Sequence, residues 1–203
     1  MLESADNATR ADLLRTNATT DVMVSLNAAM ATDGVVVGVA DGVVLTKPLH
    51  IVHVATQSST SSFTRSLLQV AKGARVTLVE SFIAANGAQG YQVNDAVVLW
   101  AGEGADVQHV RLVEDAPDAS NISTAIVTLN GRTQYNTFSL TTGSVLSRYQ
   151  GFVRFGGEEA NASINGVNLL KDQQHGDATL VIEHAVPHCQ SREIFRAVVD
   201  DRA

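Results

Sequence analysis

The densest group of reactive side chains lies near the end of the chain, where His184, His188 and the single cysteine Cys189 fall within six residues. Imidazole and thiolate groups are common ligands of zinc and related transition metals. Pro187 disfavours a helix that would bring both histidines onto one side. On an extended strand, residues four apart lie about 13 Å from each other, too far to share one ion. A turn at Pro187 would shorten that distance, so His184, His188 and Cys189 are weak candidates for a metal site.

Other polar residues offer less chemistry. His50 and His53 are three apart on an expected strand, so they face opposite sides and are not expected to share a ligand role. Asp95 and Asp106 stand singly, whereas acid–base cleavage of a glycosidic bond needs paired carboxylates. The chain has no Gly-Lys pair for a phosphate-binding loop, and no G-x-S-x-G, C-x-x-C or H-E-x-x-H motif. We therefore expect no catalytic residue and no enzymatic activity.

Composition narrows the class of protein. The chain has 203 residues, 45% of them apolar, which is enough for one sizeable core. Its net charge of −7, with only 14 scattered Lys and Arg residues, argues against a nucleic-acid partner. One cysteine excludes an intrachain disulfide and is typical of a reducing cytoplasm. No apolar run reaches the roughly 18 residues that span a membrane, so we expect no membrane partner.

A repeated unit, a small-residue turn followed by an alternating strand, positions all of these residues. It starts at Gly73, Gly104, Gly131, Glu158 and Gly176, a spacing of 27 to 31 residues that shortens to 18 at the last step. A second strand can be identified within each longer period. Repeats of this length indicate a solenoid, in which each unit buries its apolar side against its neighbours. Two strands per period without a helix predict an all-β fold of stacked coils.

The residues before the repeat are less regular. Residues 1–19 are polar and predict a loosely ordered arm, and residues 20–203 predict one core domain. Thr20 or Asp21 can cap a short helix over 22–31, whose apolar face would hold Val22, Leu26, Ala29 and Met30. Asp41-Gly42 lies between two short strands and indicates a hairpin turn.

Three stretches resemble the SufB/SufD family of iron–sulfur cluster assembly proteins. They are 26–34, 47–50 and above all 184–203, where the Ser-Arg-Glu-x-Phe-Arg-Ala-Val wording is more similar to SufD than to SufB. The resemblance covers nearly everything after residue 20. It implies a right-handed parallel β-helix with two long strands per turn, which agrees with the period of the repeat.

The resemblance also implies a function. SufD-like proteins are non-catalytic scaffold subunits that pair with a SufB-like subunit and a SufC-like ABC-type ATPase. The complex builds clusters and transfers them to apo-proteins. The resemblance therefore implies that this segment holds no cofactor of its own and meets an iron–sulfur cluster only transiently, in the assembled complex. Family segments associated with cluster chemistry lie beyond residue 203, so no functional residue is carried over.

Two other interpretations remain open: a β-solenoid carbohydrate-active enzyme and a purely structural β-solenoid. The chain stops after an apparent strand, 193–199, without a polar cap, so we expect it to be a segment of a longer protein. An uncovered strand edge favours pairing with another chain. We therefore expect the isolated segment to form a homodimer through its C-terminal coil.

Overall fold

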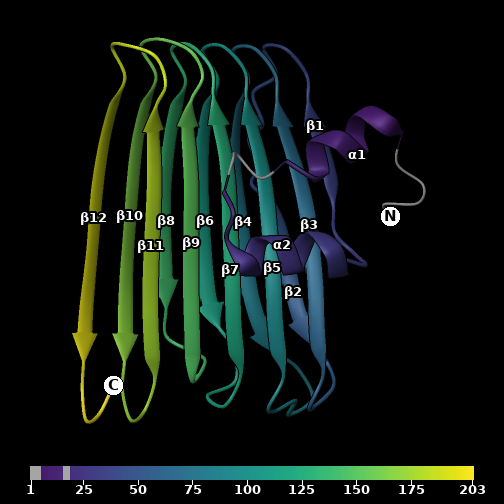
Figure 1. Cartoon of the computed structure of the whole chain (residues 1–203), viewed down its shortest axis with the longest axis vertical. Coiled ribbons are helices and arrows are strands. Elements are labelled where there is room, and N and C mark those ends of the chain that lie inside the picture. The colour runs from purple at the N-terminus through teal and green to yellow at the C-terminus, as the bar shows by residue number, and fades with distance from the viewer. Residues whose placement is uncertain (1–5, 16–18) are drawn as a thin grey trace.

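Each strand of the protein pairs in parallel with strands two positions away in the chain, so the polypeptide winds as a coil. The computed structural model describes residues 6–15 and 19–203. Its odd-numbered strands form one six-stranded sheet and its even-numbered strands another, as Figure 1 shows. The predicted all-β parallel β-helix with two strands per turn is confirmed. Its elements are α1 (Asn7–Leu13), α2 (Val22–Met30), β1 (Val36–Val39), β2 (Leu49–Ala55), β3 (Ser61–Val70), β4 (Arg75–Ala84), β5 (Gln92–Ala101), β6 (Asp106–Glu114), β7 (Ser120–Leu129), β8 (Gln134–Thr141), β9 (Leu146–Phe155), β10 (Asn161–Leu170), β11 (His175–His184) and β12 (Gln190–Val199).

The sequence repeat corresponds to one sheet of the β-helix. The units at Gly73, Gly104, Gly131 and Glu158 lead into β4, β6, β8 and β10, which are neighbours in the even-numbered sheet. The unit at Gly176 was assigned to the same series, but it lies in β11 of the odd-numbered sheet. Its short spacing of 18 residues therefore marks half a turn of the coil rather than an irregular repeat.

The predicted hairpin at Asp41-Gly42 is wrong. Gly42 has a φ of 66° and its amide donates to the carbonyl of Lys72 at 2.8 Å, so this corner stacks on the next corner of the coil. Val44 then forms a parallel bridge with Arg75. A coil corner needs the same left-handed glycine as a tight hairpin turn. The local sequence therefore could not tell the two apart.

The main core lies between the two sheets. Along the odd-numbered sheet, Leu68, Leu99, Val127 and Val153 occupy one register position and stack on each other. Similar stacking at neighbouring inward positions of both sheets gives the β-helix its main apolar core.

Two helices cover the outer face of the odd-numbered sheet (Figure 1). The predicted helix is present as α2 and is capped by Asp21, whose side chain accepts from the amide of Met23. The predicted apolar face is wrong, because Val22 is 75% exposed while Val24 and Asn27 are fully buried. A second apolar cluster joins the helices to the sheet: Leu13, Val24, Leu67, Val98, Ile126 and Phe152.

The predicted arm contains a helix that the sequence analysis did not anticipate. Asp6 caps α1 by accepting from the amide of Thr9 at 2.7 Å, and Leu13 at the end of α1 is buried. Residues 1–5 and 16–18 of the arm lie outside the described residues. In the part that is described, the arm is packed against the sheet through α1.

Arg65, on the outer face of β3, holds both helices. Its Nη1 donates to Asn27 Oδ1 at 2.9 Å, and its other nitrogens donate to the carbonyls of Leu13 and Arg15. Burial lowers the pKa of Arg65 to about 10, so the side chain is still charged at neutral pH. Asn27 in turn donates to the carbonyl of Thr64 at 2.9 Å. The helices are therefore joined to the coil by a buried polar network as well as by apolar contacts. Across the described ranges, no helix is long and apolar enough to cross a membrane.

The stacked interior makes a testable prediction about stability. Leu99 is 1% exposed, so Leu99→Ala should lower the free energy of unfolding by about 2–5 kcal/mol, the usual cost of such a cavity. Leu169, on β10, is 43% exposed, and Leu169→Ala should change the free energy by less than about 0.5 kcal/mol. Denaturant titration of both variants measures the difference. Equal effects would show that the inward face has been misassigned.

Candidate functional site

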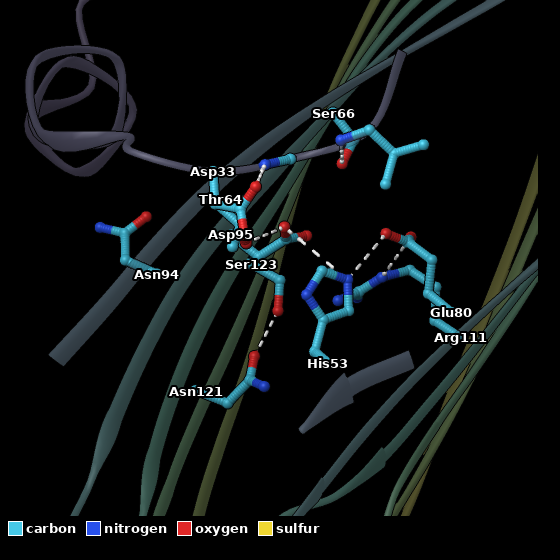
Figure 2. Close-up of polar contacts among 12 residues, drawn as sticks. Asp33, His53, Thr64, Ser66, Glu80, Asn94, Asp95, Arg111, Asn121 and Ser123 are labelled. Carbon is cyan, nitrogen blue, oxygen red and sulfur yellow. Dashed lines mark hydrogen bonds and ion pairs between the residues drawn. The ribbon is translucent and has the colours of Figure 1, made fainter. Parts of the chain in front are cut away.

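Three ionisable side chains from three strands meet inside the first coils of the β-helix. Alternation along β2 turns His53 inward, alternation along β4 turns Glu80 inward, and Asp95 points in from β5 in the opposite sheet. Figure 2 shows the His53 ring between the two carboxylates. Among the described residues, these three form the one group of His, Cys, Asp and Glu whose ligand atoms all lie within 4.8 Å of one another.

Glu80 is fully buried and ionised. Its Oε2 lies 2.6 Å from His109 Nε2 and 3.4 Å from Arg111 Nε. Burial by itself would raise the pKa of the Glu80 carboxyl. The hydrogen bond from His109, the nearby ring of His53 and the charge of Arg111 outweigh that effect and hold the pKa of Glu80 well below its usual range. Glu80 is therefore a fixed negative charge in the interior.

Asp95 has a different environment. Its Oδ1 accepts from the Thr64 hydroxyl at 2.6 Å, while its Oδ2 is buried without a hydrogen-bond partner. Burial and repulsion from Glu80 raise the pKa of Asp95, although the charge of His53 opposes the shift. Two neighbouring carboxylates therefore have pKa values displaced in opposite directions, an arrangement that is common at functional sites.

The His53 ring lies between the two carboxylates but forms a hydrogen bond with neither. Its Nε2 lies 3.8 Å from Glu80 Oε1 and 3.9 Å from Asp95 Oδ1, both too long for a hydrogen bond. The ring stacks on Phe82, with the centroids 4.3 Å apart. Burial lowers the pKa of His53, but the charges of Asp95 and Glu80 exceed that effect and raise it.

A pocket of about 780 Å³ leads to this cluster from the surface. The pocket is lined by residues 30 and 32–35, by β2 from Ile51 onward, by the start of β3 and by the first residues of β5. His53 and Thr64 belong to the lining, and the His53 side chain is 11% exposed. Small solutes can therefore reach His53, while Glu80 and Asp95 lie behind it.

Arg111 closes the other side of the cluster. Its guanidinium carbon lies 5.2 Å from the Phe82 ring centroid and 4.7 Å from that of Tyr149, so the charge is held between two aromatic rings. Its Nη1 and Nη2 are buried without hydrogen-bond partners. Of the two carboxylates, only Glu80 forms an ion pair with Arg111 in the described residues.

The arrangement can bind a small cation or hold a proton, but it cannot cleave a polysaccharide. A glycoside hydrolase needs its two carboxyl groups on either side of a sugar ring. Glu80 and Asp95 are 0% and 1% exposed and face the interior of the coil. The open alternative of a carbohydrate-active enzyme required an outward cleft with paired carboxylates, and this pair does not provide one.

The structure does not bring the sequence-derived metal candidates together. Residues 186–188 form a bend, which is the kind of turn that would shorten the distance between His184 and His188. His184 Nε2 nevertheless lies 3.3 Å from the Ser191 hydroxyl, Cys189 faces the carbonyl of Gly157, and His188 occupies the bend with a φ of 61°. Across residues 6–15 and 19–203, His184, His188 and Cys189 form no group with metal-ligand spacing.

Sequence reasoning missed the cluster that does form. His53 and His50 do face opposite sides of β2, as expected, but His53 meets two carboxylates instead. The interpretation of Asp95 as an isolated residue is wrong. Asp106 forms an ion pair with Arg75 at 3.0 Å and accepts from Gln108 at 2.9 Å, near the surface. The sequence did contain a signal, namely polar residues at inward positions of otherwise apolar strands. To tell which of these residues meet, one must know the register between the strands.

Comparison with known proteins identifies one protein family and two relatives that this chain resembles. Residues 53–203 match the model of the SufBD core domain of the SUF system for FeS cluster assembly. The chain is 26% identical over 194 residues to an iron–sulfur cluster assembly SufBD family protein of Synechocystis. It is 23% identical over 186 residues to the iron–sulfur cluster assembly protein SufD of Escherichia coli. Each alignment covers 90% of this chain, and the chain spans 42% and 44% of the two relatives.

The opposite pKa shifts of the two carboxylates predict opposite pH effects on stability. Glu80→Gln should destabilise the chain at neutral pH by about 3–5 kcal/mol, because it leaves Arg111 and His109 without their buried partner. A lowered folded-state pKa stabilises the fold above the ordinary Glu value of about 4.3, and that contribution is lost in acid. The deficit of Glu80→Gln should therefore shrink as the pH falls below about 4.

Asp95→Asn should behave in the reverse way. A raised folded-state pKa stabilises the fold only in acid, and this contribution is lost as the pH rises through the folded value. Asp95→Asn should thus equal or exceed the parent in stability at pH 7, and its relative advantage should vanish below about pH 4. Denaturant titrations between about pH 2 and pH 8, with a chelator present, measure both variants. Parallel pH profiles for the two would contradict the assignment.

Proposed function

We propose a scaffold function for this chain, which belongs to the SufBD core family of SUF-system iron–sulfur cluster assembly proteins. Membership supports a role in iron–sulfur cluster assembly. The finer proposal is that the chain is part of a SufD-like, non-catalytic subunit in a complex of SufBCD type. In that complex it supports the building of clusters and their transfer to apo-proteins, and the cluster is cargo rather than a resident cofactor.

The family match over residues 53–203 carries this proposal, because it includes β3 to β12 and thus nearly the whole coil. The similarity to SufD of Escherichia coli supports the SufD-like assignment. The chain spans less than half the length of the curated relatives that it matches. Partners and activities of a whole protein therefore enter as proposals: a SufB-like subunit and a SufC-like ABC-type ATPase.

We place the proposed complex in the cytoplasm. Cluster assembly uses reduced sulfur and iron, and a reducing compartment keeps thiols free. Cys189 is a free cysteine that lies partly exposed in the last corner of the coil, between β11 and β12. This placement is consistent with such a compartment.

Affinity purification tests the scaffold proposal. The full-length protein, tagged at its own locus and purified from iron-limited cells, should bring down an ABC-type ATPase and a second SufBD-family subunit in near-stoichiometric amounts. An unrelated tagged β-helix protein from the same cells is the control. Recovery of the tagged protein with neither partner, under conditions where cluster assembly is active, would contradict the proposal.

The strand edge offers a surface for association. β12 pairs with β10 on one side and is the last strand of the even-numbered sheet in the described chain. Gln190 and Asp200 donate their amides to the carbonyls of Ala160 and Leu170, both at 3.0 Å. Because amides alternate along a strand, the even-numbered amides of β12 face β10 and the odd-numbered ones, such as that of Ala197, face the open edge.

The 203-residue chain is therefore predicted to form a homodimer by edge pairing at its C-terminal coil. Ala197→Pro removes an outward donor without breaking the bonds to β10, so it should weaken the dimer about tenfold, because a two-fold contact loses one donor from each protomer. Ala197→Ser keeps the donor and is the matched control. Sedimentation at tens of micromolar measures both. A monomeric parent, or a dimer that tolerates proline, would show that the edge is not the interface.

A further inference from the structure

We propose that the His53 imidazole and the carboxylates of Glu80 and Asp95 form a binding site for one divalent transition-metal ion. The site lies inside the first coils, between β2, β4 and β5. The inference stands on the geometry of the cluster and does not rest on the proposed scaffold function. It differs from the expectation of a segment without a cofactor of its own, for which His184, His188 and Cys189 were the weak candidates and His50 and His53 were expected to share no ligand role.

The spacing of the three side chains suits one ion. His53 Nε2 lies 3.8 Å from Glu80 Oε1 and 3.9 Å from Asp95 Oδ1. Nitrogen and oxygen ligands lie about 2.0–2.2 Å from a bound zinc ion, so two ligands of one ion can be up to roughly 4.4 Å apart. The largest separation in the cluster is within 4.8 Å, and a small rotation of one side chain would close it.

Each of the three side chains has one buried polar atom without a hydrogen-bond partner. His53 Nε2, Glu80 Oε1 and Asp95 Oδ2 are all buried and make no hydrogen bond. Burying one polar atom unpaired is costly, and such groups are rare in folded proteins. Figure 2 shows that the three side chains that carry these atoms point toward one another. One cation between them would satisfy the three atoms at once.

The remaining atoms of the same side chains are held in place. His109 and Arg111 occupy Oε2 of Glu80, which leaves Oε1 for the ion. Thr64 donates to Oδ1 of Asp95, and the Phe82 ring supports the ring of His53. Hydrogen bonds of this kind orient ligands in metal sites and raise their affinity.

The charge balance favours a cation over a water molecule. Arg111 forms an ion pair with Glu80, whereas the ion-pair partner of Asp95 is the His53 ring, at 3.9 Å. A water molecule could bridge the three atoms, but it would add no positive charge beside the two buried carboxylates. A divalent ion would add positive charge beside both.

The ligand set selects the class of metal. Magnesium and calcium prefer ligand sets made of oxygen alone, whereas imidazole favours zinc, iron and other first-row transition metals. One nitrogen and two oxygens from the protein leave further positions for water. The pocket lined by His53 and Thr64 gives the ion and its water a path from the surface.

Cobalt(II) titration of the metal-free 203-residue chain tests the site. Cobalt absorbs visible light, and the spectrum reports the coordination of the ion. We expect saturable binding of one cobalt per chain, displacement by zinc, and no displacement by the same concentration of magnesium. The absence of a saturable one-to-one site would overturn the proposal.

Variants locate the site. His53→Ala and Asp95→Asn should each weaken cobalt binding by at least about 100-fold, since each removes a direct ligand. His50→Ala is the matched control, because His50 lies on the same strand but faces outward and contacts the Ser81 hydroxyl at 2.8 Å. Asp95→Asn is expected to remain at least as stable as the parent at pH 7, so its loss of binding would not reflect unfolding.

Two results would place the metal elsewhere and overturn the assignment. One is cobalt binding that survives both His53→Ala and Asp95→Asn in folded protein. The other is binding that is lost in Cys189→Ser or His184→Ala, which would return the site to the last corner of the coil. Circular dichroism and thermal melts of every variant establish that each is folded before it is titrated.

Discussion

Parallel pairing in register, between strands two positions apart in the chain, determines the environment of every side chain in this coil. Successive residues of a strand point to opposite faces, so a slip of one residue would exchange the interior and the surface of a whole strand. The pairing of Leu68 with Leu99 and of Leu99 with Val127 keeps apolar residues in one column. The same constraint brings Glu80 beside Arg111. The apolar core and the polar cluster thus depend on a single register.

Burying polar side chains inside such a coil lowers the stability of the fold, and hydrogen bonds and ion pairs within the cluster reduce this loss. Glu80 is satisfied on one oxygen by His109 and Arg111, and Asp95 on one oxygen by Thr64. Each carboxylate therefore keeps one buried oxygen without a hydrogen-bond partner. A fully apolar column would be the simpler way to fill these positions. Retaining two carboxylates here is more consistent with a binding role than with a packing role.

Local signals in the sequence were sufficient for the architecture but not for the site. The turns at Gly73, Gly104 and Gly131 predicted the coil, and Asp21 predicted the start of α2. Those features depend on residues close together in the chain. The meeting of His53 with Asp95 depends on how many residues each corner uses, which composition and periodicity do not reveal. The buried face of α2 was misjudged for a related reason, because Asn27 is buried by its bonds to Thr64 and Arg65 rather than by its own hydropathy.

The two helices cover only one of the two sheets, so the two sheets should differ in how readily they open locally. Central strands such as β5 and β7 are paired on both edges and covered on both faces, by the core on one side and by α2 or its apolar cluster on the other. The even-numbered sheet has the same pairing but no helical cover in the described residues. Backbone amides in β5 should therefore exchange with solvent deuterium only through openings that also release α2, whereas those in a central strand of the other sheet, such as β8, need no such event. The helices thus stabilise one side of the coil against local opening. Hydrogen exchange should therefore be slower in the central strands of the odd-numbered sheet than in those of the even-numbered sheet.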